Sequence, residues 1–405
     1  MRTFDEARRD IARELGVISP PSSLRCEVVS LSDSVGRTLA QEVRADRLYP
    51  PFDRSVRDGF AVRASDVAPG AKLKCIGELK AGDTPQFSVA PGTCVQIMTG
   101  AAVPPGADAI VMIEHTRTEG DTIVFHNAIA SGQHIVKRGA EAANGHPFVV
   151  PGSRIGFAEI AAAAQVGAVE LQVYRKPRVA ILSTGDEVVS AENVPGDFQI
   201  RNSNAYSLAA QVSLTGGEPV VLANAKDTEA DLREKILQGL KRDMLILSGG
   251  VSAGKYDLVE NVLRDLGADF HFDAVAIRPG KPTVFAICQN KPVFGLPGNP
   301  VSTMVTFELF ASLALKLLSG QERCQLTFLE ARLGESLQEK TGLAHFLPAK
   351  LSWPHGMPTV APLRWQGSGD LAAVAQSNCF LYIPADRSRF ECGEPISVLP
   401  RHDVL

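Results

Sequence analysis

Several kinds of feature are missing from the sequence, and each absence excludes a class of protein. None of the seven cysteines is spaced as Cys-x-x-Cys, and their number is odd. A disulfide framework and a structural zinc site are therefore not expected, and a reducing compartment fits the cysteine usage best. The first ten residues alternate in charge without an apolar core, so we expect no signal peptide and a cytoplasmic location.

Long apolar runs and a strong charge imbalance are also missing. No uncharged stretch of mainly apolar residues reaches the roughly 18–20 residues needed to span a bilayer. The nearest stretch, residues 305–318, contains Glu308 and Lys316 and predicts a buried helix. The 41 basic and 45 acidic residues give a net charge of −4, which disfavours a polyanion-binding protein. We therefore expect neither nucleic acid nor a membrane as a partner.

The chain is long enough for more than one hydrophobic core. Its 405 residues predict two to four domains, since one domain usually takes roughly 100–200 residues. Changes in local pattern predict four parts. These are an N-terminal linker and helical domain (residues 1–50 and 142–176), an inserted β-rich lobe (51–141), an α/β domain (177–325) and a small C-terminal β domain (326–405).

The first and last parts of the chain contain short apolar runs separated by glycine and proline, a pattern typical of strands joined by tight turns. The C-terminal runs predict a small barrel-like β domain. Helices are expected at residues 4–15, from apolar periodicity, and at 156–170, which are rich in alanine. The expected strands outside the α/β domain are residues 73–76, 93–98, 109–113, 122–125, 380–383 and 396–399.

The middle part alternates β-branched runs with amphipathic stretches. This alternation predicts a doubly wound, mostly parallel sheet with helices on both faces. The expected strands are residues 178–183, 219–222, 243–247, 275–277, 283–288 and 292–296. The expected helices are residues 203–214, 231–240, 257–266 and a long one from about residue 300.

Ligands of open α/β sheets bind beyond the carboxyl ends of the strands, so the loops that follow the expected strands are candidate sites. The first such loop is Ser183-Thr184-Gly185-Asp186-Glu187. Its adjacent carboxylates could hold a hard cation such as Mg²⁺, which prefers oxygen ligands. A solvated acidic pair that caps the next segment is an equally good interpretation.

The second loop runs from residue 248 to residue 257 and is rich in glycine. Gly249 and Gly250 would let backbone N–H groups approach a phosphate closely, next to a helix N-terminus. Gly249 to Lys255 also satisfies the first part of a P-loop, so a P-loop ATPase or kinase that uses Lys255 is an alternative. Tyr256 occupies the position where a P-loop needs Ser or Thr. A plain tight turn remains a second alternative.

The third region combines two proline-stiffened segments. Arg278 and Lys281 lie in Arg-Pro-Gly-Lys-Pro, and Pro297 and Pro300 lie in Leu-Pro-Gly-Asn-Pro. A lone Arg-Lys pair is usually solvated, but next to a glycine loop it favours neutralisation of a substrate anion. The second segment predicts a rigid turn that directs a helix N-terminus toward the ligand.

The N-terminal half has two further polar turns, at residues 53–62 and 98–109. Each is more often a simple turn than a site. The sequence contains no His-Glu-x-x-His motif, which excludes the corresponding zinc proteases.

Taken in order, these segments resemble the molybdopterin molybdenumtransferase family, whose eukaryotic relatives include the E domain of gephyrin. The resemblance covers essentially the whole chain. It departs from the family pattern at Arg57, Phe60 and Ala140. The matching motifs begin at Asp58 (DGFA), Met98 (MTGA), Ser183 (STGDE), Ser248 (SGGVS), Pro279 (PGKP), Leu296 (LPGNP) and Gly367 (GSGD).

The resemblance implies an elongated homodimer with a central domain like molybdopterin adenylyltransferase. It further implies that adenylylated molybdopterin and molybdate react with Mg²⁺ to give molybdenum cofactor and AMP, and that the adenylyltransferase is a possible partner. The site is implied to lie between the α/β domain and the β-rich lobe of the other subunit. A non-catalytic molybdopterin scaffold or carrier is the alternative within this family.

The resemblance also assigns residues to roles. Asp58 and Thr99 would act from the β-rich lobe, and Glu187, Asp227 and Asp257 from the α/β domain. The expected magnesium ligands are Asp186, Glu187 and Asp257. The expected ligand-binding residues are Ser183, Thr184, Gly185, Gly249, Gly250, Ser252, Lys255, Arg278, Lys281, Pro297 and Pro300.

Overall fold

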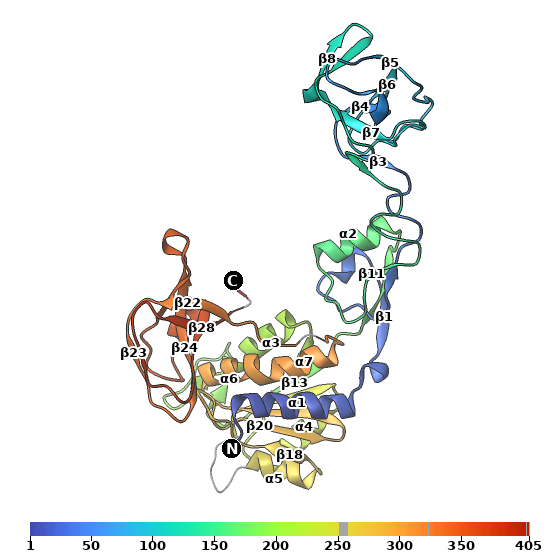
Figure 1. Cartoon of the computed structure of the whole chain (residues 1–405). Coiled ribbons are helices and arrows are strands. Elements are labelled where there is room, and N and C mark those ends of the chain that lie inside the picture. Colours follow the sequence, from blue (N-terminus) through green and yellow to red (C-terminus); the bar gives the residue numbers. More distant parts are fainter. Residues whose placement is uncertain (251–257, 323, 402, 405) are drawn as a thin grey trace. The chain divides into compact units, whose positions relative to one another are not determined.

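The computed structural model describes residues 1–250, 258–322, 324–401 and 403–404. The chain divides into two compact units, which are described separately (Figure 1). Unit 1 comprises residues 1–41, 151–156 and 170–405, and unit 2 comprises residues 42–150 and 157–169. The division into four domains remains a prediction.

Unit 1 is built around a six-stranded sheet in the order β16-β13-β17-β21-β20-β18. The first four strands of this order are parallel, and β20 is antiparallel to both of its neighbours. The predicted mostly parallel sheet is thereby confirmed. Its strands are β13 (Arg178–Ser183), β16 (Glu218–Val221), β17 (Met244–Ser248), β18 (Asp269–Phe272), β20 (Val284–Cys288) and β21 (Lys291–Leu296).

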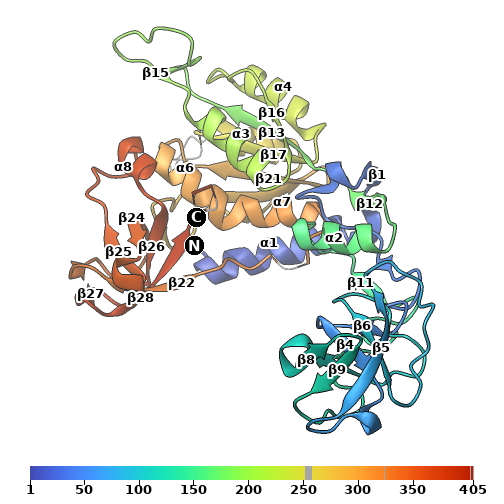
Figure 2. The ribbon, with the colours of Figure 1, turned by 90° about the horizontal axis from the view of Figure 1, so that it is seen from above.

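Helices cover both faces of this sheet, as the doubly wound pattern predicts (Figure 2). Side chains alternate along β13, so that Val179 and Ile181 enter one hydrophobic cluster while Ala180 and Leu182 enter the other. The first cluster contains residues of α1 (Phe4–Ile18), α3 (Asn204–Leu214), α6 (Pro300–Thr306) and α7 (Ser312–Leu318). The second contains residues of α4 (Glu229–Leu240) and α5 (Leu258–Asp265).

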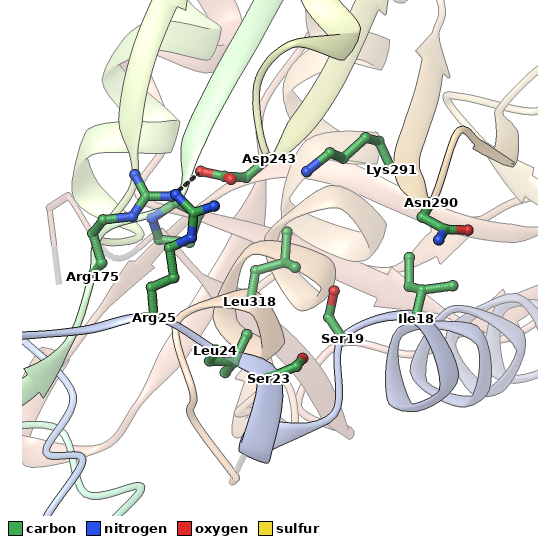
Figure 3. Close-up of a pocket in the computed structure, with 11 residues that line it drawn as sticks. Ile18, Ser19, Ser23, Leu24, Arg25, Arg175, Asp243, Asn290, Lys291 and Leu318 are labelled. Carbon is green, nitrogen blue, oxygen red and sulfur yellow. Dashed lines mark hydrogen bonds and ion pairs between the residues drawn. The ribbon is translucent and has the colours of Figure 1, made fainter.

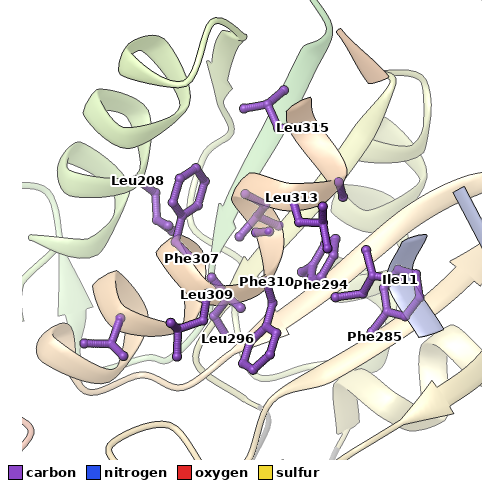
Figure 4. Packing of buried hydrophobic residues seen from close by; sticks show 14 of the residues in the cluster. Ile11, Leu208, Phe285, Phe294, Leu296, Phe307, Leu309, Phe310, Leu313 and Leu315 are labelled. Carbon is purple, nitrogen blue, oxygen red and sulfur yellow. The ribbon is translucent and has the colours of Figure 1, made fainter. Parts of the chain in front are cut away.

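The first cluster is the larger core of unit 1, and Figure 4 shows how its aromatic side chains pack. The ring centroids of Phe285 and Phe294, on adjacent strands, are 5.0 Å apart. Ile11 of α1 and Phe310 are fully buried in the same cluster. Burial of such side chains contributes roughly 1.5–3 kcal/mol each, so the N-terminal helix is an integral part of this core.

Two helices of unit 1 show how the sequence sets their ends and their burial. Thr3 and Glu6 form a reciprocal capping box at the start of α1. The segment Pro300–Leu318 continues from α6 through a π-helical turn (η5, Phe307–Ala311) into α7. Among the described residues it is the one helix long and apolar enough to cross a membrane, and 78% of it is buried inside the protein. The predicted buried helix is therefore confirmed.

The C-terminal part of unit 1 is a closed five-stranded barrel. It closes because β24 pairs with both β25 and β26. The expected strand at residues 275–277 is displaced: β19 (Ile277–Arg278) pairs with β24 and thus extends the barrel sheet, not the central one. The barrel strands are β22 (Leu329–Leu333), β24 (Ala344–Ser352), β25 (Thr359–Pro362), β26 (Cys379–Ile383) and β28 (Pro395–Pro400), with α8 (Leu371–Gln376) before β26.

Unit 2 contains a six-stranded sheet in the order β7-β4-β6-β5-β9-β8. Small hydrophobic clusters pack on its two faces, one around Phe60 and one around Ala61. The β-rich lobe is thereby confirmed, although the expected helix at residues 156–170 is shorter, at α2 (Phe157–Gln165). The sheet strands are β4 (Gly59–Val62), β5 (Lys72–Leu79), β6 (Thr93–Ile97), β7 (Ala109–Met112), β8 (Thr116–Glu119) and β9 (Thr122–Phe125).

The remaining strands are short or lie outside the three sheets above. In unit 1, β1 (Cys26–Ser30) pairs antiparallel with β12 (Glu170–Tyr174), and β14 (Val188–Val189) pairs with β15 (Ile200–Arg201). The others are β2 (Val43–Arg44), β3 (Arg54–Ser55), β10 (Ile135–Val136), β11 (Pro147–Val149), β23 (Leu337–Gln338) and β27 (Arg389–Phe390).

Candidate active site

A pocket of about 490 Å³ lies at the carboxyl ends of β13, β17 and β21. The loops after these three parallel strands form its floor, because neighbouring parallel strands end at the same edge of a sheet. Its volume lies within the range usual for small-molecule sites, roughly 300–1,000 Å³. Of the predicted ligand-binding and catalytic residues, it is lined by Ser183, Thr184, Gly185, Glu187, Asp227, Gly249, Gly250, Pro297 and Pro300.

Two asparagines at the start of α3, Asn202 just before it and Asn204 as its first residue, hold polar groups of the pocket loops. Asn204 Nδ2 donates hydrogen bonds to Ser248 Oγ at 2.8 Å and to the carbonyl oxygen of Gly298 at 2.7 Å, so it joins the loops after β17 and β21. Asn202 Oδ1 accepts the N–H of Ala205 at 3.0 Å in the manner of a helix cap. Sequence reasoning missed both, although Asn-Ser-Asn before a helix is a recognisable capping signal.

The pocket contains polar atoms that are buried yet unpaired within the described part of the chain. Thr184 Oγ1 has no hydrogen-bond partner, and Thr184 is only 4% exposed. Asn204 Oδ1 is also unpartnered. Leaving such atoms unsatisfied costs about 1–3 kcal/mol each. Because both residues line the pocket, a ligand that offers an acceptor and a donor would satisfy them.

Glycine is required at two positions of the pocket wall. At Gly250, where φ is +66°, an added Cβ would lie 2.8 Å from Thr184 Oγ1. At Gly185, where φ is +120°, it would lie 2.5 Å from a carboxylate oxygen of Glu187. Other residues rarely adopt these backbone angles. Gly250 therefore keeps the space around the unpaired hydroxyl open, and Gly185 leaves room for the Glu187 carboxylate.

The carboxylates at the rim of the pocket come from two loops. Glu187 and Asp227 line the pocket, whereas Asp186 does not; Asp186 Oδ1 accepts the backbone N–H of Asp227 at 3.3 Å. Asp257, the third expected magnesium ligand, lies outside the described residues. Over the described ranges, no three His, Cys, Asp or Glu side chains gather into a metal cluster. This arrangement fits Mg²⁺ held by one or two carboxylates together with substrate phosphates.

The predicted glycines line the pocket, whereas the predicted cations that the structure describes do not. Arg278 and Lys281 are exposed and do not line the pocket, although the adjacent Pro282 does. Lys255 and Ser252 lie outside the described residues. Among the residues that the structure describes, Arg201 of β15 is the one cationic side chain in the lining, and sequence reasoning missed it.

The turn from Pro297 to Pro300 is fastened to the barrel domain. Asn299 Nδ2 donates to Ser368 Oγ at 2.9 Å, and the N–H of Val301 donates to the carbonyl oxygen of Ser368 at 3.0 Å. The Gly-Ser-Gly-Asp motif around Ser368, in the C-terminal part of unit 1, thus holds the pocket loop in place through these hydrogen bonds. Its place next to this turn could not be derived from sequence spacing.

In unit 2, the structure brings Asp58 and Thr99 together from separate loops. The backbone N–H of Thr99 donates to Asp58 Oδ1 at 2.6 Å, and this hydrogen bond holds the pKa of Asp58 below its ordinary value. Both residues are exposed. The next residue, Gly59, admits no side chain, because a Cβ would lie 1.9 Å from the carbonyl oxygen of Val111. A charged carboxylate is therefore presented to solvent at a defined place.

The positions that depart from the family pattern have structural partners in unit 2. Phe60 is 2% exposed and belongs to the hydrophobic cluster of the lobe. Glu141, which follows Ala140, forms an ion pair with Arg54 at 2.6 Å. Lys137 pairs with Asp53 at 2.7 Å and lowers the pKa of that carboxyl group. Arg57 is exposed.

Parallel strands that end in loops of glycine, hydroxyl and amide groups define an α/β protein that binds a phosphorylated or otherwise anionic ligand. Comparison with known families is more specific. The chain matches the MoeA N-terminal region (domain I and II) over residues 2–167, the probable molybdopterin binding domain over 180–317, and the MoeA C-terminal region (domain IV) over 330–400. It belongs to the molybdopterin molybdenumtransferase family and is an enzyme of molybdenum cofactor biosynthesis.

Individual relatives are similar to this protein in sequence along nearly the whole chain. Molybdopterin molybdenumtransferase of a Nostoc species is 34% identical over 92% of this chain and 88% of the relative. That of Bacillus subtilis is 33% identical over 92% and 89%. The crystal structure of the molybdopterin biosynthesis MoeA protein from Pyrococcus horikoshii OT3 covers 99% of this chain and 100% of its own, with a TM-score of 0.81 and 26% identity.

Proposed function

We propose that the protein inserts molybdate into adenylylated molybdopterin, with Mg²⁺ as cofactor and AMP as the second product, in the cytoplasm. The observation that carries the proposal is the pocket over β13, β17 and β21, with its glycine walls and its unpaired Thr184 hydroxyl. The family supports molybdopterin and molybdate as substrates. We further expect the adenylyltransferase that makes the nucleotide to be a functional partner.

The chemistry of the pocket suits cleavage of a pyrophosphate linkage. This reaction needs charge neutralisation and positioning more than a protein nucleophile. Thr184 Oγ1 and the backbone N–H of Gly250 would donate to phosphate oxygens, while Asn204 Oδ1 would accept from an N–H or O–H of the ligand. When bound, Mg²⁺ would act as a Lewis acid, and Glu187 would hold it with the substrate phosphates.

AMP release tests the proposal directly. Purified protein is mixed with adenylylated molybdopterin, molybdate and Mg²⁺, and AMP is measured by chromatography. We expect AMP and molybdenum cofactor to appear in equal amounts, and both to depend on molybdate and on the divalent ion. Tight pterin binding without AMP release under any divalent ion would instead support a carrier. Steady ATP hydrolysis in the absence of pterin would support a P-loop enzyme.

We also propose that the protein acts as a homodimer in which Asp58 and Thr99 of one subunit serve the pocket of the other. Asp58→Asn keeps the acceptor for the Thr99 N–H but removes the charge, so we expect the fold to persist and the rate of AMP release to fall roughly 10²-fold. Mixing this variant with Glu187→Gln, followed by subunit exchange, should restore part of the activity.

The mixing experiment separates the two arrangements. In a trans arrangement, a mixed dimer contains one pocket with both carboxylates intact, so up to about half of the wild-type rate per mixed dimer returns. If Asp58 and Glu187 served a pocket of the same chain, no pocket in the mixture would be complete. Absence of any recovery, with exchange verified by mass spectrometry, would contradict the trans arrangement.

A further inference from the structure

A second pocket, of about 260 Å³, lies at the opposite end of the central sheet. Asp243 directly precedes β17, Pro177 precedes β13, and Lys291 begins β21. The end of α1 and the segment around Arg25 close the other side, so segments distant in sequence meet there (Figure 3). Since β13 is six residues long, about 20 Å of strand separates this pocket from the candidate active site.

The charged side chains that line this second pocket are predominantly cationic. Arg25, Arg175 and Lys291 line it against a single carboxylate, Asp243 (Figure 3). Arg175 Nη2 pairs with Asp243 Oδ2 at 2.8 Å, and the same oxygen accepts the backbone N–H of Arg178 at 2.7 Å. Asp243 Oδ2 is therefore occupied by contacts within the protein. Its negative charge neutralises Arg175 and leaves Arg25 and Lys291 without a carboxylate partner among the described residues that line the pocket.

Spare donors remain in the pocket. Arg175 Nε is buried without a hydrogen-bond partner, and the side chains of Arg25 and Lys291 make no hydrogen bond or ion pair with the described residues. An arginine fork matches the oxygens of a phosphate group, and a lysine adds a point charge. Two uncompensated cations and an orphaned N–H thus point to a ligand with negative charge and several acceptor oxygens.

Helix ends supply the opposite polarity at the same place. Ile18 and Ser19 at the end of α1 and Leu318 at the end of α7 line the pocket, and helix C-termini carry about half a negative charge each. The net field is therefore less positive than the side chains alone suggest. A hydrogenphosphate group suits this mixture, because its P–OH can donate to a helix carbonyl while its other oxygens accept from the cations. Sulfate has no such donor.

We propose that this pocket is a second ligand site, specific for a small phosphate group. Its volume excludes a pterin nucleotide but accommodates a phosphate ion or a short phosphomonoester. The site is separate from the molybdenum insertion chemistry, and its existence does not depend on the function proposed above.

Isothermal titration calorimetry at low ionic strength tests this assignment with inorganic phosphate, sn-glycerol 3-phosphate and sulfate as probes. The variant is Arg25→Gln/Lys291→Gln, whose side chains form no hydrogen bond or ion pair with the residues that the structure describes. The control is Lys241→Gln/Lys340→Gln, which removes the same charge from exposed positions outside the pocket. We expect phosphate affinity to fall at least tenfold in the variant and less than twofold in the control, with AMP release unchanged in both.

The probes also separate the sources of the phosphate group. Binding of both phosphates indicates a phosphomonoester site, and binding of inorganic phosphate alone indicates a site for the free ion; each supports the proposal. Sulfate that binds as tightly as phosphate would overturn the assignment to phosphate. Equal phosphate affinity in wild type and variant would overturn the site itself, whatever the outcome of the AMP assay.

Discussion

The two ends of the central sheet carry different chemistry although the same strands run through both. At the carboxyl ends of β13, β17 and β21, the described lining is made of hydroxyls, amides, glycine backbone and acidic side chains, with Arg201 as its cation. At the amino ends of these strands, three cationic side chains face one carboxylate. The two ends of the sheet therefore differ in the groups that can bind an anion: uncharged donors at the carboxyl ends of the strands, and arginine and lysine side chains at the amino ends.

The direction of the backbone explains this difference. Helices that follow parallel strands begin at the carboxyl edge, where free N–H groups and positive helix ends already attract anions. A site at that edge can therefore bind phosphate with few cations and can spare carboxylates for a metal. Helices end at the amino edge, where their carbonyls repel anions. A site there needs arginine and lysine side chains to reverse the polarity.

The largest expected effect concerns the carboxyl end. Glu187→Gln preserves size and hydrogen bonding but removes the rim charge, so we expect AMP release to fall at least 10²-fold, since removal of a charged catalytic group typically costs that much. Glu187 is exposed, so the melting temperature should not change. Rates are measured at saturating substrate with Mg²⁺ varied.

Asp197→Asn is the matched control, because Asp197 is also exposed and lies in the neighbouring segment without lining the pocket. Its rate should stay within twofold of wild type. Phosphate binding at the amino end should be unaffected by either variant. A Glu187→Gln enzyme of normal rate would show that acidic groups at this edge do not serve catalysis.

An intermediate effect is expected when the pocket wall is closed. Gly250→Ala and Gly216→Ala each place alanine at positive φ, +66° and +98°, which costs about 1–2 kcal/mol of stability. Only the first adds a methyl group 2.8 Å from Thr184 Oγ1; at Gly216, near the amino end, no atom lies within 4 Å. We expect at least tenfold slower AMP release in Gly250→Ala alone.

Chemical denaturation and steady-state rates together check this pair of variants. We expect the larger loss of stability in Gly250→Ala, because its methyl group would also lie 2.8 Å from Val259 Cγ2 in the core. A rate defect in this variant alone, under conditions where both variants remain folded, would locate the defect at the pocket wall. If both variants lost activity equally, the effect would come from backbone strain, and the open wall at Gly250 would have no part in ligand binding.

The smallest expected effect concerns the stability of the amino end. Asp243→Ala removes the acceptor of Arg175 and of the Arg178 N–H. The Arg175–Asp243 pair is partly exposed, with side chains 30% and 28% accessible, so we expect a loss of about 1 kcal/mol after solvent screening. Arg25→Gln/Lys291→Gln should change the unfolding free energy by less than about 0.5 kcal/mol.

Urea denaturation at low salt measures both variants, with phosphate absent. A large loss of stability in the double variant would mean that Arg25 and Lys291 serve the fold, for example by neutralising the helix ends. That result would argue against anion binding as the role of Arg25 and Lys291 at the amino edge, because these cations would then stabilise the fold.

Much of the architecture could be predicted because local pattern and packing agree. Alternation in β13 placed Val179 and Ala180 on opposite faces, and both are buried as expected. The displaced strand β19 shows the limit: Ile277 has the local pattern of a strand, but nothing local specifies that its partner is β24 of the barrel. The additional strand β18 is short and polar at its start, so it carried no periodic signal.

In the candidate site, too, the residues that follow a local sequence pattern could be predicted, whereas those that depend on distant contacts could not. Gly185, Gly249 and Gly250 were predictable because loops after the strands of an open α/β sheet lie where ligands bind, and the structure places all three in the pocket lining. Arg278 and Lys281 were expected there from proximity in sequence, yet they do not line it. Asn204 was missed because its amide group acts across space, on Ser248 and Gly298. Asn202 was missed because its side-chain N–H likewise donates to a distant residue, Asn224.

By itself, the sequence determined the alternation of strands and helices and the glycine-rich loops that follow the strands, because these depend on neighbours a few residues away. Tertiary structure alone decided which side chains share a pocket, that Asp58 meets Thr99, and that Arg25, Arg175 and Lys291 gather at the amino edge of the sheet. Contacts between distant segments depend on the packing of the whole core, and no short stretch of sequence encodes that packing.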